Sequence, residues 1–193
     1  MSIVKLNNPK TKLYTEIKNN ILKGSIDWCY LNETTSEFDK STRESYNFIL
    51  KKYNQEGKIL FNTPMYNHIF LARSNNNQLY TKVFSPYIDS INQMYCEILN
   101  TNINIIKSFN MMCRCAANAV EPSQKENIIT VPHIDHDFPH KNMLIYLTDS
   151  GGSTFVEGEE FAPEEDDVIM FEGIHWHKLP KEERRVVLVM TYI

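Results

Sequence analysis

The stretch MLIYLTDSGGSTFV, residues 143–156, decides the expected fold because it holds two apolar runs separated by a turn. The runs Met143–Leu147 and Ser153–Val156 are short and bounded by turn residues, as strands are. Between them the residues DSGG, 149–152, are typical of a β-hairpin turn. The stretch therefore predicts two strands joined by a tight turn.

Short apolar runs of the same kind fill the second half of the chain. They are separated by turns and are too short to indicate long helices. The other runs are Ile105–Val120, Ile128–Val131, Asp167–Phe171 and Arg185–Tyr192. This spacing predicts an all-β sandwich or barrel.

The first half of the chain contains two amphipathic patterns with helical spacing. One runs from Thr11 to Lys23, where Gly24 ends it, and the other runs from Ser85 or Pro86 to about Leu99. Two apolar segments between these helices, Ser25–Leu31 and Asn67–Arg73, could add strands. We expect a mainly β protein of the α+β class, with the N-terminal helices packed outside the barrel.

Length and composition are those of an ordinary folded protein. The chain has 193 residues, of which 42% are apolar and 23% charged. These proportions exclude disordered, collagen-like and coiled-coil proteins. We expect residues 1–193 to form a single domain around one core. In that domain, residues 1–104 would be a helical and mixed support region and residues 105–193 the β core.

Charge divides the sequence at Lys125. The residues up to Lys125 carry 15 basic and 10 acidic side chains, whereas residues 126–193 carry 5 basic and 14 acidic ones. Seven of these acidic side chains lie between Glu157 and Asp167, which indicates a solvated loop. Because like charges repel phosphates, this run argues against a nucleic-acid groove on that face and disfavours a nucleic-acid partner.

The sequence indicates an intracellular protein. It contains no run of about 18 apolar residues that could cross a membrane, and its first residues lack the features of a secretory signal. The four cysteines are scattered, and we interpret them as small hydrophobic residues in a reducing compartment. We expect a cytoplasmic location and no membrane partner.

Five of the six histidines lie in the segments VPHIDHDFPH and GIHWH. On an extended strand His133 and Asp135 project to the same face, so both could bind one metal ion. A histidine of the second segment could be the third ligand, and His175 and His177 would share a face there. Two histidines and one carboxylate are typical ligands of non-haem Fe(II) in oxygenases, and they leave positions open for a chelating co-substrate and O₂.

An arginine pair follows the second histidine segment. The guanidinium of Arg185 could hold a carboxylate of the co-substrate through two parallel hydrogen bonds. Arg184 and Arg185 point to opposite sides of a strand. The alternation of Arg185, Val187 and Val189 favours Arg185 as the inward residue and leaves Arg184 in solvent.

With these residues the chain resembles the 2-oxoglutarate and Fe(II)-dependent dioxygenases, in particular prolyl-hydroxylase-like members. The family pattern is H-x-D, a distant histidine and an arginine on the following strand. The segments MLIYLTDSGGSTFV and DDVIMFEGIHWHKLP are similar to family segments around these positions. The whole pattern, with SIDWCYL and CRCAANAVEP, is similar to small oxygenases encoded by marine bacteriophages. In an infected host cell such a protein would be cytoplasmic.

The resemblance implies a fold, a metal site and a co-substrate site. The fold is a double-stranded β-helix, which is a jelly-roll or cupin-like barrel. Fe(II) would be bound by His133, Asp135 and His177, because the family's Trp-His pairing favours His177 over His175. The co-substrate 2-oxoglutarate would be bound by Arg185, and Tyr146 would contact its tail. Further candidates of lower rank are His175, Arg184, Asn118 and Arg114.

The activity implied by the resemblance is hydroxylation of a C–H bond by O₂, with decarboxylation of 2-oxoglutarate to succinate. A peptidyl side chain, including prolyl, is the first expected substrate, and a small molecule such as a free amino acid is the second. Nucleobase demethylation ranks third. The alternative is a non-catalytic jelly-roll binding module or a cupin-like metal-binding protein. Such a protein would not need Arg185 or an open coordination face.

Overall fold

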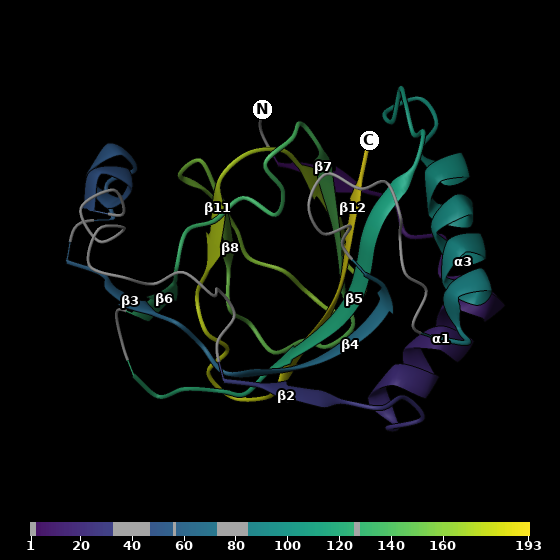
Figure 1. Cartoon of the computed structure of the whole chain (residues 1–193), viewed down its shortest axis with the longest axis horizontal. Helices are drawn as coiled ribbons and strands as arrows, with labels where there is room; N and C mark the ends of the chain where they lie inside the picture. The colour runs from purple at the N-terminus through teal and green to yellow at the C-terminus, as the bar shows by residue number, and fades with distance from the viewer. Residues whose placement is uncertain (1–2, 33–46, 56, 73–84, 126–127) are drawn as a thin grey trace.

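The computed structural model describes residues 3–32, 47–55, 57–72, 85–125 and 128–193. Its largest element is a seven-stranded sheet, the main sheet, with the order β1-β10-β7-β12-β5-β4-β2 (Figure 1). Each pair of neighbours in this sheet is antiparallel. The strands are β1 (Val4–Leu6), β2 (Cys29–Leu31), β4 (Met65–Leu71), β5 (Met112–Val120), β7 (Lys141–Tyr146), β10 (Val168–Phe171) and β12 (Arg185–Tyr192).

A smaller sheet of three antiparallel strands, the minor sheet, has the order β11-β8-β9. Its strands are β8 (Thr154–Val156), β9 (Glu159–Phe161) and β11 (His175–His177). A parallel pair, β3 (Ile59–Phe61) with β6 (Ile128–Thr130), stands beside it. The predicted mainly β, cupin-like barrel is confirmed.

The two faces of the main sheet pack against different partners. On β12, Leu188 and Met190 share one hydrophobic core with residues of the helices α1 (Lys12–Leu22) and α3 (Ile88–Thr101). Val187 and Val189 belong instead to a cluster with Val156 of the minor sheet. Because side chains alternate along a strand, β12 supplies both the helix-facing core and the barrel interior.

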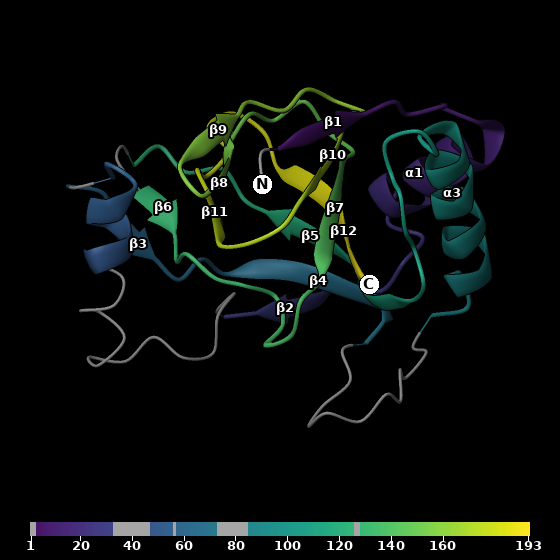
Figure 2. The same cartoon turned by 90° about the horizontal axis from the view of Figure 1, so that it is seen from above.

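Both predicted helices are confirmed and lie side by side on the outer face of the main sheet (Figures 1 and 2). Helix α1 begins after Thr11, whose hydroxyl accepts a hydrogen bond from the backbone N–H of Tyr14 and so caps the helix. In the described part of the chain, neither helix has the length and apolar character that a membrane crossing requires.

The predicted hairpin at residues 149–152 is wrong. β7 pairs with β10 and β12 in the main sheet, whereas β8 pairs with β9 and β11 in the minor sheet. The turn signal is real, because Gly151 and Gly152 both have positive φ angles. The turn carries the chain from one sheet to the other, so the strands on either side of it do not pair.

The N-terminal region contributes more to the barrel than the sequence indicated. β1, β2 and β4 all belong to the main sheet, although the β core was expected to begin at residue 105. The single domain stays a prediction. Residues 159–161 within the expected acidic loop form β9, with both of its glutamates exposed.

Ion pairs connect the basic and acidic parts of the chain. Lys5 pairs with Asp167 at 2.6 Å between Nζ and Oδ1, and Lys10 pairs with Asp166 at 3.0 Å between Nζ and Oδ2. Lys18 on α1 also pairs with Asp166. Part of the charge division found in the sequence is therefore neutralised by contacts within the fold.

Candidate metal and co-substrate site

Three side chains meet inside the barrel with the donor atoms that a metal ion requires. One ligand atom each of His133, Asp135 and His175 lies within 4.8 Å of the other two. Two backbone hydrogen bonds between His133 and His175, of 2.9 and 3.0 Å, hold the two histidines opposite each other. The segment after β6 and the strand β11 thus bring the histidines together, and the H-x-D spacing adds the carboxylate.

The hydrogen bonds of the two histidines leave their Nε2 atoms as electron-pair donors. The Nδ1 atom of His133 lies 2.9 Å from the carbonyl oxygen of Val131. The Nδ1 atom of His175 lies 3.4 Å from the carbonyl oxygen of Gly173. A carbonyl oxygen only accepts, so each Nδ1 carries the proton and each Nε2 keeps a lone pair. Burial lowers the pKa of His175 to about 3, so this imidazole is neutral at pH 7. Metal-binding histidines commonly have this arrangement.

The third group, Asp135, is only 5% exposed and lies between a cation and a histidine. Its Oδ1 is 3.2 Å from Nη1 of Arg114, and its Oδ2 is 3.6 Å from Nε2 of His175. Arg114 therefore holds Oδ1 of the carboxylate, while Oδ2 faces the histidine. Arg114, a candidate of lower rank, thus lies beside the group formed by His133, Asp135 and His175, which we call the metal group, and pairs with Asp135.

The position of His177 differs from the sequence prediction. On β11 it faces Thr154, whereas His175 faces Val156 and makes the backbone bridge to His133. Its Nδ1 lies 2.8 Å from Oγ1 of Thr154, and its ring is outside the group of donors within 4.8 Å. The two histidines do share a face, as expected, but the bridge aligns His175 with the H-x-D segment. The geometry therefore favours His175.

Arg185 is a buried cation that faces the same cavity, which has a volume of about 190 Å³. Val187 and Val189 line this cavity with it, so the predicted inward alternation is confirmed. Nη1 of Arg185 donates to the carbonyl oxygens of Gly152 at 2.9 Å and Lys178 at 3.2 Å.

The described residues supply no carboxylate to Arg185. Its Nε atom is buried and has no hydrogen-bond partner among them. Burial lowers the pKa of the guanidinium because the charged form loses its hydration. A buried cation without an anionic partner is costly, so the site is suited to a bound carboxylate.

Tyr146 does not line this cavity but is connected to it through Thr154 and then His177. Its hydroxyl lies 2.6 Å from Oγ1 of Thr154, which also contacts His177. Burial raises the pKa of Tyr146 to about 12, so its hydroxyl keeps its proton. Its direct contact with a co-substrate stays a prediction.

The remaining candidates have structural contacts. Asn118 lines the cavity and its Oδ1 accepts a hydrogen bond of 2.5 Å from Nδ2 of Asn67. Arg184 is exposed, as expected, and pairs with Glu121. Sequence reasoning missed Thr130, which accepts from the backbone N–H of His177 at 2.9 Å, and Thr154. A threonine in a strand gives no signal of its own, because it is an ordinary strand residue.

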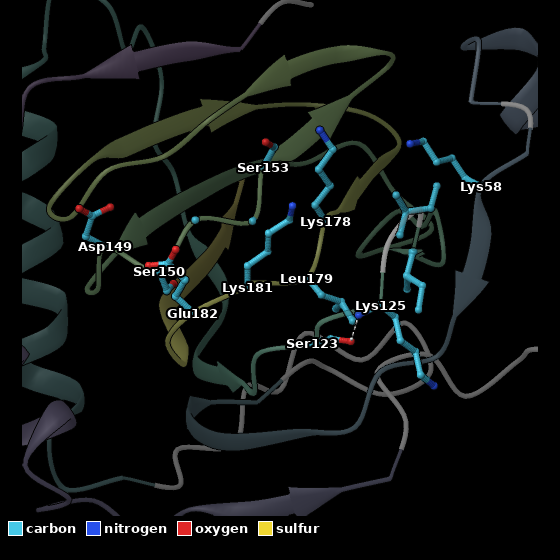
Figure 3. Close-up of a pocket in the computed structure, with 14 residues that line it drawn as sticks. Lys58, Ser123, Lys125, Asp149, Ser150, Ser153, Lys178, Leu179, Lys181 and Glu182 are labelled. Atoms are coloured by element: carbon cyan, nitrogen blue, oxygen red, sulfur yellow. Dashed lines mark hydrogen bonds between the residues drawn. The ribbon is translucent and has the colours of Figure 1, made fainter.

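A second cavity, of about 610 Å³, is lined by residues that include Lys178 and Lys181 (Figure 3). Gly152, whose carbonyl oxygen accepts from Arg185 as that of Lys178 does, also lines this second cavity. The ammonium group of Lys178 pairs with Glu160 at 2.6 Å. The backbone that holds Arg185 therefore lines the second cavity, whereas the Arg185 side chain lines the first.

Comparisons with known proteins agree with this architecture. Neither a family model nor a curated protein matches the sequence. A 2OG-Fe(II) oxygenase family oxidoreductase from Burkholderia pseudomallei matches the structure over 96% of this chain and 93% of its own, with a TM-score of 0.51 and 13% identity. The likeness shows the fold.

Two further solved structures match at lower scores. A viral collagen prolyl hydroxylase from Paramecium bursaria Chlorella virus-1 has a TM-score of 0.46 and 16% identity, over 86% of this chain and 94% of its own. A predicted oxalate decarboxylase from Thermotoga maritima has a TM-score of 0.39 and 9% identity, over 67% and 81%.

Proposed function

We propose that this protein is an Fe(II)- and 2-oxoglutarate-dependent dioxygenase that hydroxylates a C–H bond. The observation that carries this proposal is the combination of two sites in one cavity. His133, Asp135 and His175 offer two imidazoles and a carboxylate. Arg185, on the wall of the same cavity, is a buried cation with no anionic partner among the described residues.

The donor set fits Fe(II). Nitrogen and carboxylate oxygen ligands suit non-haem iron, and three protein ligands leave positions open for a chelating co-substrate and O₂. The guanidinium of Arg185, which has no anionic partner among the described residues, fits 2-oxoglutarate. The 2-oxo group and adjacent carboxylate of this molecule could chelate the metal while its other carboxylate binds the arginine.

Each residue then has a role that its contacts support. His133, Asp135 and His175 would hold the iron, and Arg114 would keep Asp135 charged and in place. Arg185 would hold the distal carboxylate of 2-oxoglutarate. Bound together, the iron and 2-oxoglutarate supply the oxidising chemistry, in which O₂ is consumed, 2-oxoglutarate becomes succinate and CO₂, and one oxygen atom enters the substrate. Val187, Val189 and Leu144 line the cavity and would exclude water from it.

The substrate is proposed here as a chemical class. The cavity of about 190 Å³ is small, so only a side chain or a small molecule would reach the metal. A peptidyl side chain, including prolyl, is our first choice, and a free amino acid or other small metabolite is the second. Ile134, between two proposed ligands and 54% exposed, is an apolar contact available to either.

Anaerobic addition of Fe(II) and 2-oxoglutarate to the purified protein tests the function. We expect a visible charge-transfer band from the chelated co-substrate and, after O₂ is admitted, release of succinate. A panel of peptides and small metabolites, screened for stimulated succinate release, would then identify the substrate class. Metal binding with no band and no 2-oxoglutarate-stimulated oxygen uptake would favour a cupin-like metal-binding protein instead.

A further inference from the structure

Three side chains from three strands form a hydrogen-bonded row beside the cavity. Tyr146 on β7 lies 2.6 Å from Thr154 on β8, measured between Oη and Oγ1. Thr154 lies 2.8 Å from Nδ1 of His177 on β11. Tyr146 and Thr154 are almost fully buried, and neither lines the cavity, whereas His177 does. The row therefore ends in the cavity at His177.

The protons of this row can be assigned by counting donors and acceptors. Thr154 has one hydroxyl proton, so it can donate to only one of its two neighbours. If it donates to Tyr146, the buried tyrosine proton has no acceptor among the described residues, which is costly. If Tyr146 donates to Thr154 and Thr154 donates to Nδ1 of His177, both buried hydroxyl protons have acceptors, and the proton left without one is on the His177 ring, which lines the cavity.

The second arrangement determines what His177 presents to the cavity. A neutral imidazole that accepts at Nδ1 carries its proton on Nε2. This tautomer is the opposite of that in His133 and His175, whose Nδ1 atoms face carbonyl oxygens. His177 thus offers a hydrogen-bond donor where the other two offer lone pairs. Its Nε2 has no hydrogen-bond partner within the described part of the chain.

We propose that His177 is a co-substrate-binding residue that donates a hydrogen bond from Nε2 to a carboxylate oxygen of 2-oxoglutarate. Thr154 and Tyr146 are positioning residues that fix its tautomer. The proposal rests on the proposed function. It follows from the geometry because Arg185 and His177 line one cavity, next to the metal group, and both present donors to it. A dicarboxylate has oxygen atoms for both.

Calorimetric titration of the Zn(II)-loaded protein with 2-oxoglutarate tests the proposal without turnover. His177→Leu removes the donor, and we expect the dissociation constant to rise roughly tenfold to hundredfold, as for loss of a hydrogen bond to a charged group. His177→Gln keeps an N–H donor at a similar reach and is expected to recover part of the affinity. Zn(II) affinity should stay within about threefold of wild type in both variants, because His177 is not a ligand.

Thr154 supplies a second pair of variants that leaves the imidazole in place. Thr154→Val removes the hydroxyl without changing the shape, and Thr154→Ser keeps it. We expect weaker 2-oxoglutarate binding for Thr154→Val and near wild-type binding for Thr154→Ser. ¹⁵N NMR of the His177 imidazole in the Zn(II)-loaded protein should show the Nε2-protonated tautomer in wild type and a mixture in Thr154→Val.

The outcomes separate this inference from the proposed function. Wild-type protein that binds no 2-oxoglutarate would overturn both. Unchanged 2-oxoglutarate affinity in His177→Leu, or an Nδ1-protonated His177 in wild type, would overturn the inference alone. Loss of Zn(II) binding in His177→Leu would overturn it in favour of His177 as a metal ligand.

Discussion

Replacing Gly152 with alanine should displace the contacts that hold the guanidinium of Arg185. Gly152 has a φ of +83°, and a Cβ built on it would lie 2.8 Å from the carbonyl oxygen of Lys178 and 3.1 Å from Nη1 of Arg185. These atoms form one of the hydrogen bonds that hold the guanidinium. A methyl group therefore has no room unless Lys178 or Arg185 moves.

The expected cost has two parts. A residue other than glycine at positive φ costs about 1–2 kcal/mol, and forcing a methyl group into a packed region costs about 1–3 kcal/mol more. We expect Gly152→Ala to lower the free energy of unfolding by about 2–5 kcal/mol. It should also weaken 2-oxoglutarate binding, because the displaced contacts are those of Arg185.

Gly151 is a matched control. It has a φ of +66°, but a Cβ there would meet nothing within 4 Å. Gly151→Ala should thus cost only the backbone contribution of about 1–2 kcal/mol. Urea denaturation gives the unfolding free energies, and calorimetry on the Zn(II)-loaded variants gives the 2-oxoglutarate affinities. Equal stabilities, with unchanged affinity in both variants, would refute the reasoning about Arg185.

Three further predictions concern the metal group and the core. His133→Ala and His175→Ala should each abolish Co(II) binding measured by absorbance. The control variant His68→Ala, on β4, should still bind Co(II). If either of the first two variants retains binding, the histidine replaced in it is not a ligand. Burial lowers the pKa of His175 from 6.5 to about 3. Between these pH values the unfolded chain therefore binds more protons at this residue than the folded chain does. The metal-free protein should thus lose stability as the pH falls from 6.5 towards 3. A flat denaturation profile over this range would contradict it. Leu188→Ala, at a fully buried position of β12, should cost about 2–5 kcal/mol in urea denaturation, and a loss below about 1 kcal/mol would contradict its central place in the core.

The inward direction of Arg185 could be predicted from the sequence because β12 is long and regular. Over eight residues its alternation has only one register in which Val187, Val189 and Arg185 share a face. The structure keeps that register against β7 along the strand and against β5 as far as Thr191, after which the pairing with β5 shifts. The amphipathic helices were predictable for a similar reason, since their apolar stripes are long enough to define a period.

The choice between His175 and His177 could not be made from the sequence. β11 has three residues, and both histidines lie on the same face of it. The two histidines differ because only His175 forms the backbone bridge to His133. This contact joins residues 42 positions apart, so no local sequence pattern predicts it. The course of the chain after residues 149–152 was missed for a related reason, because a turn signal gives the bend and not the strand that the chain pairs with afterwards.

The place of β12 in the main sheet has a consequence for how the protein is made. β12 lies between β5 and β7, both of which precede it in the sequence. During synthesis the edges of β5 and β7 that pair with β12 therefore stay unpaired until residues 185–192 have been made. Chains with such unpaired edges are prone to aggregation, and chaperones protect nascent chains at this stage. The same strand carries Arg185, so an unfinished sheet also lacks the buried cation. The step that closes the sheet is then the step that creates the proposed carboxylate site, and incompletely folded chains would not bind 2-oxoglutarate there.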